Sequence, residues 1–326
     1  MTPEPGFLQR AGSKWLNFWF PAPSLHLLAS IRIGTGLVFV YALLLRSYDL
    51  EAQFSSEILG DPQAMAAAAQ MAWPFSLFGW FDGSGWLWTV HIAAIGAGLA
   101  FLLGIFPGVS GALSLVFHLS YLHANPAVVV GLDGLITLAL AYLTLMPCGR
   151  RWTVLWWRNR PAEAPVIRRS AAQNEPPPWH GVVLRALQIH LCLLYFQSGL
   201  AKLDAGWLGG VALWHPGLVE KGGAFAPETL QAYPLLLSLV PYLLALFELF
   251  FPVFVWIPRL RYVALAAALG IHLSVGLLWE KLPFNLLMLV LVAAFIPSDR
   301  VEKLVRWLGG LAGRGESILA PYRAGP

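Results

Sequence analysis

The sequence has little charge, little cysteine and none of the common catalytic motifs. Only 12% of its 326 residues are charged, about half of the roughly 25% usual in soluble domains. Cys148 and Cys192 lie far apart and form no CxxC pair, so neither a disulfide framework nor a metal site is predicted. No HExxH, GxSxG or Walker motif is present. Gly34-Thr-Gly36 and Gly96-Ala-Gly98 are predicted to pack helices closely rather than to bind phosphate.

Long apolar runs dominate what remains. Hydrophobic residues make up 58% of the chain, and several runs reach the roughly 20 residues that a bilayer core requires. The sequence therefore predicts an all-α, polytopic integral membrane bundle of about eight transmembrane helices, with the lipid bilayer as its main partner. The predicted spans are Leu25–Leu45, Gly85–Phe106, Val109–Ala124, Ala127–Met146, Gly181–Leu203, Tyr233–Ile257, Tyr262–Trp279 and Pro283–Ile296.

Composition divides the chain into five parts. Residues 1–24 form a basic, aromatic segment typical of a membrane interface. Residues 25–147 and 181–297 are the two halves of the membrane domain. Between them, residues 148–180 form a basic, proline-rich linker, and residues 298–326 form a basic tail. A short amphipathic helix is predicted at 61–72, in an acidic loop.

Charge asymmetry predicts the orientation. With both termini inside, the inner segments hold most of the basic residues and the outer loops hold most of the acids. The net charge of +4 is then a topology signal, and no nucleic-acid partner is expected. No cleavable signal peptide is recognised, so the first span is expected to direct insertion. We expect the chain in the inner (plasma) membrane, with its active face on the extracytoplasmic side.

One polar stripe interrupts the fifth span. Counting back from Lys202 in helical steps places Ser198, Gly199 and Tyr195 on one face, with Gln188 further inward. Because a polar stripe that ends in an amine is costly against lipid, this face is predicted to point toward protein or water. The alternative is a lysine that snorkels to the membrane boundary.

Other spans bring polar groups to the same outer half of the membrane. Each intramembrane ionisable group costs roughly 2.5–3.5 kcal/mol, so we expect these groups to meet Lys202 around one outer cavity. In the third span such groups recur at helical spacing: Ser114, His118, Tyr121 and Asn125. Asp133 lies in the outer part of the fourth span, and His272 lies in the outer part of the seventh.

Structural interpretations of these residues remain open. A single membrane histidine is commonly a satisfied packing residue. Asp133 could pair with a neighbouring lysine or cap the fourth span. Glu248, beside Pro252, could form a hydrogen bond with a carbonyl group that the proline kink frees. Arg32 could reach the inner boundary or pair with an acid.

An amine in such a cavity has chemical uses. A lysine that burial keeps neutral is a competent general base for a weakly acidic hydroxyl, such as the phenolic proton of a quinol. A carboxylate such as Asp204 or Asp133 would instead hold it charged. A haem held by His118 and His272 is a further possibility, although nothing in their spacing singles out this pair.

The segment Tyr195-Phe-Gln-Ser-Gly-Leu-Ala-Lys-Leu-Asp-Ala-Gly-Trp-Leu-Gly-Gly210 resembles the hallmark of the HTTM (horizontally transferred transmembrane) superfamily, the membrane domain of vitamin K-dependent gamma-carboxylases. Asn125-Pro-Ala-Val-Val-Val-Gly-Leu-Asp133, Pro147-Cys-Gly149, His272 and Phe295-Ile-Pro297 are similar to its bacterial members. The resemblance covers roughly residues 25–297. Lipase maturation factors share a related Ser-Gly-x-x-Lys-Leu pattern.

The resemblance implies a role for the lysine. In the carboxylases, the matching lysine deprotonates vitamin K hydroquinone, and oxygenation then yields the epoxide. This role maps onto Lys202, with Asp204, Trp207 and Gly210 as scaffold. We therefore expect vitamin K hydroquinone or another isoprenoid quinol as cofactor. Lys202, His272 and Asp133 are the predicted catalytic residues, and Tyr195, Ser198, Asn125, His118 and Trp207 are the predicted cofactor-binding residues.

The sequence also departs from the carboxylases. Ala201 stands where they carry a second lysine, and Pro126 stands where they carry a histidine. The residues after the last span are expected inside, with no luminal domain, which disfavours peptide glutamate carboxylation. A quinol-dependent oxidation, or another modification with a separate peptide or redox partner protein, is the favoured interpretation. A non-catalytic maturation or transport-like factor, whose polar cluster is structural, is the alternative.

Overall fold

The computed structural model describes residues 7–59, 75–154, 177–209, 234–278 and 281–319. Within these ranges the chain is helical and contains no strand. The helices are α1 (Phe7–Trp19), α2 (Leu25–Arg46), α3 (Leu50–Phe54), α4 (Ser56–Leu59), η1 (Leu77–Gly79), α6 (Ser84–Leu103), α7 (Pro107–Ala124), η2 (Pro126–Val128), α8 (Gly131–Leu145), α10 (Trp179–Ala201), α11 (Ala205–Leu208), α14 (Pro234–Phe254), α15 (Pro258–Leu278), α16 (Leu282–Val292), η5 (Ala293–Phe295) and α17 (Ser298–Leu319).

Two predictions fall wholly or mostly outside the described residues. The predicted helix at 61–72 lies outside them, and so does the interior of the predicted linker, residues 155–176.

A helix lies at each of the eight predicted spans, but the number that cross the membrane stays a prediction. Four helices, α2, α6, α10 and α15, are long and apolar enough to span. A fifth candidate is the pair Leu282–Phe295 and Ser298–Leu308, which is bent by 107°. The fourth span begins later than predicted, because η2 and an extended Val129 and Val130 precede α8.

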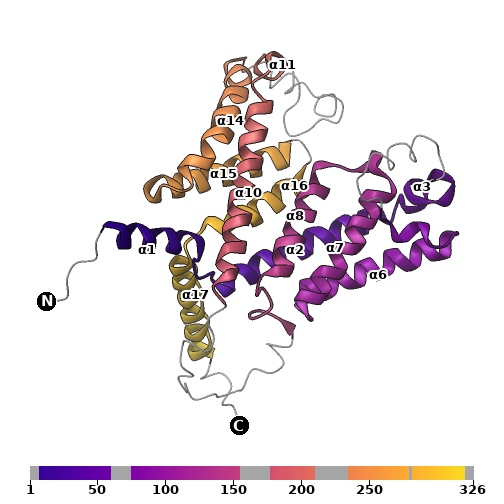
Figure 1. Cartoon of the computed structure of the whole chain (residues 1–326), viewed down its shortest axis with the longest axis horizontal. Helices are drawn as coiled ribbons and strands as arrows, with labels where there is room; N and C mark the ends of the chain where they lie inside the picture. Colours follow the sequence, from indigo (N-terminus) through magenta and orange to yellow (C-terminus); the bar gives the residue numbers. More distant parts are fainter. Residues whose placement is uncertain (1–6, 60–74, 155–176, 210–233, 279–280, 320–326) are drawn as a thin grey trace, which may run out of the picture.

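The helices form two groups that meet at α16. In the first group, α2 packs on α6, α6 on α7, and α7 on α8. In the second, α10 packs most extensively on α14, and α15 packs on α16. Figure 1 shows α16 between the groups, where it also contacts α2 and α8. Residues far apart in the sequence therefore meet along α16.

Close helix contacts explain most of the paired glycines. A Cβ atom on Gly36 would lie 2.9 Å from Cα of Leu102, and one on Gly98 would lie 3.1 Å from the ring of Phe39. These positions confirm close packing between α2 and α6. Gly96 differs, since a Cβ atom there would meet nothing within 4 Å.

Arg32 takes neither of its predicted roles. The side chain is fully buried and binds backbone carbonyl groups, with Nη2 donating to Trp152 O at 2.6 Å and Nη1 to Phe101 O at 3.4 Å. Phe101 lies in the last turn of α6, where the negative end of the helix dipole attracts a cation, and its carbonyl oxygen also accepts from the backbone nitrogen of Gly104 at 3.1 Å. The arginine therefore joins a helix end to the chain after α8, and no acid is needed.

The two amphipathic end helices lie on one side of the bundle, toward the lower left of Figure 1. α1 exposes Trp15 and Leu16, as the predicted interfacial segment requires. α17 is tied to α2 by its residue Glu302, which accepts hydrogen bonds from Ser24 Oγ at 2.8 Å and lies 3.0 Å from His26 Nδ1. The start of the first apolar helix is therefore fixed to the tail helix.

Candidate functional site

The polar stripe of α10 faces protein, as predicted. Tyr195 and Gly199 are buried, and Ser198 and Lys202 are partly buried. A Cβ atom on Gly199 would lie 2.8 Å from the backbone nitrogen of Leu249. The missing side chain at this position therefore allows α14 to approach the stripe closely.

This approach brings Lys202 to a carboxylate that was not predicted as its partner. Nζ lies 2.5 Å from Oε2 of Glu248 and 2.6 Å from Oγ of Ser198. The two charged side chains are only 17% and 16% exposed. Lys202 directly follows the last residue of α10, and its side chain turns back along that helix to Ser198, so the amine points into the bundle and does not extend outward. The amine is paired, and this geometry does not present it as a free neutral base.

The Lys-Leu-Asp-x-x-Trp motif builds a cover over the amine. Asp204 caps the short helix α11, accepting from the backbone nitrogens of Gly206 and Trp207 at 2.7 and 3.0 Å. Asp204 therefore does not pair with Lys202. The cap holds Trp207 so that its ring centroid lies 5.1 Å from Nζ, a cation–π contact. The indole also donates to the carbonyl of Pro241, which anchors it to α14.

A second hydrogen-bonded chain runs beside the ion pair. Nδ1 of His272 lies 2.8 Å from Oδ1 of Asn285, whose amide nitrogen donates to the carbonyl of Lys281. Because Oδ1 only accepts, Nδ1 must carry the hydrogen. In the neutral ring Nε2 is then an acceptor, and the Tyr195 hydroxyl, 2.6 Å away, donates to it. Three helices, α10, α15 and α16, are joined by this chain.

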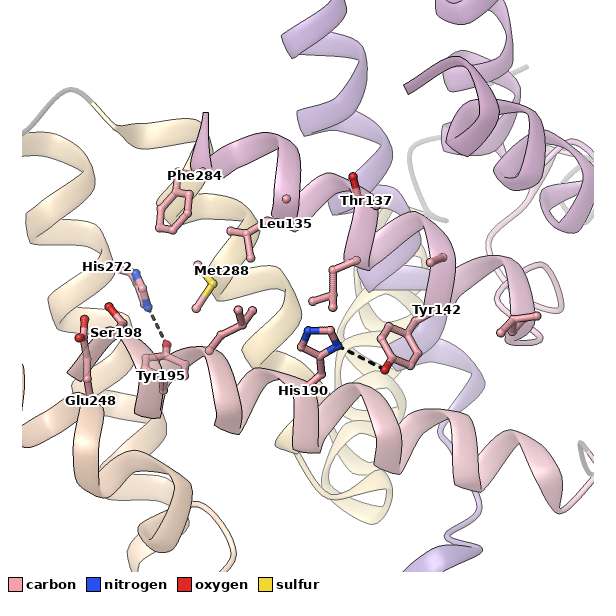
Figure 2. A pocket seen from close by; sticks show the side chains of 16 residues that line it. Leu135, Thr137, Tyr142, His190, Tyr195, Ser198, Glu248, His272, Phe284 and Met288 are labelled. Atoms are coloured by element: carbon pink, nitrogen blue, oxygen red, sulfur yellow. Dashed lines mark hydrogen bonds between the residues drawn. The ribbon is translucent and has the colours of Figure 1, made fainter. Parts of the chain in front are cut away.

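These groups close one end of a large cavity of about 810 Å³. Figure 2 shows Glu248, Ser198, Tyr195 and His272 at this end. The cavity follows α8 from Gly131 to Leu145, roughly 21 Å at 1.5 Å per residue. His190 and Tyr142 form a second polar pair, away from the first. Apolar side chains form most of the wall of the cavity: Leu135, Leu138, Leu145, Leu194, Phe284 and Met288.

The other predicted site residues form a separate cluster on the opposite face of α8. Asp133 pairs with Arg46 at 3.0 Å and also accepts from the backbone nitrogen of Val130. The guanidinium carbon of Arg46 lies 5.0 Å from the ring centroid of Tyr121. Asp133 therefore both caps α8 and neutralises an arginine. The prediction of a single shared cluster is wrong because α8 turns Asp133 toward α2 and α7 and presents Gly131 and its neighbours to the cavity.

The predicted polar face of α7 exists, but it also belongs to this second cluster. Ser114, His118 and Tyr121 are almost fully buried. His118 Nε2 lies 3.0 Å from the carbonyl oxygen of Asp133. Asn125 donates to the carbonyl of Gln53 at 2.8 Å and accepts from the nitrogen of Ala127. His118 and Asn125 are thus bound by backbone groups away from Lys202, and His118 does not face His272 as a haem pair would require.

Glu248 is the residue that sequence reasoning assigned to another role. It was interpreted as a partner for carbonyl groups near the kink at Pro252, whereas it accepts a hydrogen bond from Lys202. The sequence did contain a feature that could have predicted this pairing, because Glu248 is the one acid in α14. A lone intramembrane carboxylate requires a cation, and of the two in the neighbouring predicted span, Arg185 and Lys202, Lys202 lies at the outer end.

A comparison with protein-family models assigns most of the chain to one family. The model described as "HTTM domain" matches residues 63–299. No curated protein and no solved structure matches the chain. The match includes the whole cavity, the Lys202–Glu248 pair and the Tyr195–His272 chain. The chain belongs to the HTTM domain family of membrane proteins.

Proposed function

We propose that the chain binds an isoprenoid quinol in the cavity beside α8 and removes a proton from its head group. The observation that carries this proposal is that Glu248, the carboxylate of the ion pair with Lys202, lines one end of a long, largely apolar cavity. A quinol has the same polarity, with hydroxyl groups at one end and an apolar tail. The volume of about 810 Å³ lies in the usual range for small-molecule sites, roughly 300–1,000 Å³.

The ion pair supplies the proton acceptor. Glu248 uses Oε2 for Lys202, and Oε1 has no hydrogen-bond partner among the described residues. We propose that a quinol hydroxyl transfers its proton to Oε1, which leaves a quinolate anion and a neutral carboxylic acid. The ammonium group of Lys202 then stabilises the anion as it forms. Lys202 acts in this mechanism as the electrostatic partner, and the carboxylate takes the proton.

Tyr195 and His272 position the head group. The tyrosine hydroxyl is held by the histidine, so its oxygen can still accept a hydrogen bond from a ligand. Ser198 lines the same end and donates or accepts through its rotatable hydroxyl. With the orientation given by the positive-inside rule, this end lies in the outer half of the membrane and the extracytoplasmic face is the active one.

Dioxygen is the electron acceptor that we propose. Oxidation of a quinol by dioxygen yields the quinone and hydrogen peroxide, and epoxidation yields the quinone epoxide and water. Formation of the quinone removes two electrons from the quinol and reduces dioxygen to hydrogen peroxide. Formation of the epoxide removes four electrons, with one oxygen atom entering the ring and the other leaving as water. Both outcomes remove the two hydroxyl protons of the quinol, so each requires a proton acceptor at the head group. A separate redox or peptide partner would act after this step.

The test is aerobic turnover of vitamin K hydroquinone by the purified chain in lipid nanodiscs, followed by chromatography and mass spectrometry. We expect quinone or epoxide to form with the unaltered chain and to fall by about 100-fold in Glu248→Gln, the lower end of the usual contribution of a positioned acid or base. Glu57→Gln is the matched control, because Glu57 is exposed on α4. Equal turnover by Glu248→Gln and the unaltered chain would remove the carboxylate from the mechanism.

Formation of no product by the unaltered chain, at several quinol tail lengths, would favour the second candidate. In that case the Tyr195–His272–Asn285 chain, whose hydrogen bonds are satisfied within the protein, is structural. The protein would then be a non-catalytic membrane factor.

A further inference from the structure

Two arginines line a second, smaller pocket at the opposite end of α10 from Lys202. Arg185 comes from α10 and Arg261 from α15, and the pocket between them has a volume of about 120 Å³. Gln188, Trp256 and Ser298 also line it. Figure 1 shows α1 and α17 close to this end of α10. The pocket is separate from the quinol cavity, with which it shares no residue.

Arg185 is held in a fixed position. Its Nε donates to the carbonyl of Phe18 at 2.7 Å, and its Nη1 donates to Oε1 of Gln188 at 2.7 Å. The guanidinium carbon lies 4.6 Å from the ring centroid of Phe18 and 5.0 Å from that of Trp256. Gln188 is fixed in turn by a bond to the carbonyl of Ala294. The described residues leave Nη2 without a partner.

Arg261 adds a second positive charge to the same pocket. Its Nε donates to the carbonyl of Val255 at 3.0 Å, and the described residues provide no partner for Nη1 or Nη2. The charge of Arg261 acts repulsively on that of Arg185. Two like charges held beside each other in a partly buried pocket are unfavourable unless an anion lies between them.

No described carboxylate supplies that anion. Within the described ranges neither arginine has an acid within salt-bridge distance. Two acids of α17 near its start are engaged elsewhere, since Glu302 binds Ser24 and His26 and Asp299 lies within 4.0 Å of Lys303. The pair of arginines therefore has free donors, fixed geometry and no internal counter-charge.

We propose that this pocket binds the phosphate group of an anionic phospholipid at the inner membrane surface. Its volume of about 120 Å³ is roughly four times the 30 Å³ share of a water molecule, enough for a phosphate group and its ester oxygens. Planar guanidinium groups match phosphate oxygens with paired hydrogen bonds. Basic pockets between membrane helices on the cytoplasmic side are typical lipid head-group sites.

The surroundings favour a lipid over free phosphate. Phe18 of α1 contacts Arg185 and Trp256, which line the pocket. The same helix exposes Trp15, Leu16 and Phe18, at 63%, 56% and 36%, and offers an apolar surface for acyl chains. The predicted orientation places this end at the inner boundary, where basic and aromatic residues gather. A phosphate that carries acyl chains uses both features, whereas inorganic phosphate uses only the arginines.

The test is native mass spectrometry of the full chain released from nanodiscs that contain equal amounts of phosphatidylglycerol and phosphatidylcholine. We expect the unaltered chain to retain phosphatidylglycerol preferentially, and Arg261→Gln and Arg185→Gln each to lower this preference by about five- to tenfold. Arg259→Gln is the matched control, because Arg259 is exposed and does not line the pocket. Its preference should equal that of the unaltered chain.

Three results would overturn the proposal. Equal retention of both lipids by the unaltered chain would show that no anionic head group is selected. An equal loss in Arg259→Gln would show attraction by general positive charge. Displacement of the lipid by millimolar inorganic phosphate would show that the pocket takes the free ion. Arg261→Gln keeps the test valid if Arg185→Gln fails to fold, because Arg261 makes a single described hydrogen bond.

Discussion

Nζ of Lys202 lies 2.5 Å from Oε2 of Glu248, although the two residues are 46 positions apart. The ion pair joins α10 to α14, and its carboxylate, Glu248, lines one end of the cavity. Both side chains are mostly buried, so water screens their attraction only partly. The first consequence concerns stability, because removal of either charge leaves the other in an apolar surrounding.

Lys202→Met should lower the free energy of unfolding by about 1–3 kcal/mol, the range for a lost charged hydrogen bond. The double variant Lys202→Met/Glu248→Gln should lose less than the sum of the single losses, because no unpaired charge remains. Denaturation in mild detergent measures both values. Lys303→Met is the control, since its pair with Asp299 is 62% exposed on both sides and is expected to contribute less than about 1 kcal/mol. Strictly additive losses at the first pair would show that the two charges do not interact.

Gly199→Ala should separate α10 from α14. The added Cβ atom would lie 2.8 Å from the nitrogen of Leu249 and 3.2 Å from the oxygen of Ala245, and such overpacking costs about 1–3 kcal/mol. Gly96→Ala is the matched control, because its Cβ atom meets nothing within 4 Å and helix propensity favours alanine by up to about 1 kcal/mol. Thermal unfolding of the two variants should shift in opposite directions. A Gly199→Ala protein as stable as the unaltered chain would contradict the close approach.

Tyr195→Phe should remove the hydrogen bond to His272 while the ring keeps its stacking on Phe251 at 4.0 Å. A loss of about 1 kcal/mol is expected for one buried hydrogen bond. Nitrogen NMR of labelled histidine should place the hydrogen of His272 on Nδ1 in the unaltered chain. Tyr142→Phe is the control, since its hydroxyl lies 3.5 Å from His190, at the limit of a hydrogen bond. A hydrogen on Nε2 alone would contradict the chain that runs to Asn285.

Asp133→Asn tests whether the cluster of Asp133, Arg46 and Tyr121 is structural and independent of the proposed site. Loss of the carboxylate leaves Arg46 without its ion pair, and such a loss costs about 3–5 kcal/mol for a buried pair. Quinol turnover per folded molecule should not change, because Asp133 faces away from the cavity. Asp82→Asn, at an exposed position, should change neither property. A stable Asp133→Asn protein without turnover would return Asp133 to the catalytic residues.

The sequence predicts local features of this molecule well. Apolar runs locate the helices, and the helical period places Tyr195, Ser198 and Lys202 on one buried face of α10. The same period places Ser114, His118 and Tyr121 on one face of α7. These properties depend on neighbours within a few turns, which the sequence contains directly. The resemblance to the HTTM superfamily is confirmed by the family match.

Contacts between helices could not be predicted in the same way. The predicted topology placed Asp133 and Lys202 at the same depth in the membrane, but depth does not fix the direction in which a helix turns each side chain. α8 turns Asp133 toward Arg46 and its glycines toward the cavity. The partner of Lys202 depends on which helix packs beside α10, and Gly199 sets that distance only in combination with α14. The rotation of each helix about its axis and the identity of the helix packed beside it are tertiary properties. They determine which charged side chains meet.

The central claim is that the cavity beside α8 holds the quinol, and Gly134→Leu tests it most directly. Gly134 lines the cavity, and a Cβ atom there meets nothing within 4 Å, so leucine should fill the space without strain and leave the ion pair intact. Gly96→Leu is the matched control on exposed α6 surface. The measurement is the amount of vitamin K quinone that the purified chains retain in nanodiscs. Strong loss in Gly134→Leu, with full retention in Gly96→Leu, is the predicted result. Equal retention by both variants would contradict the proposed binding site.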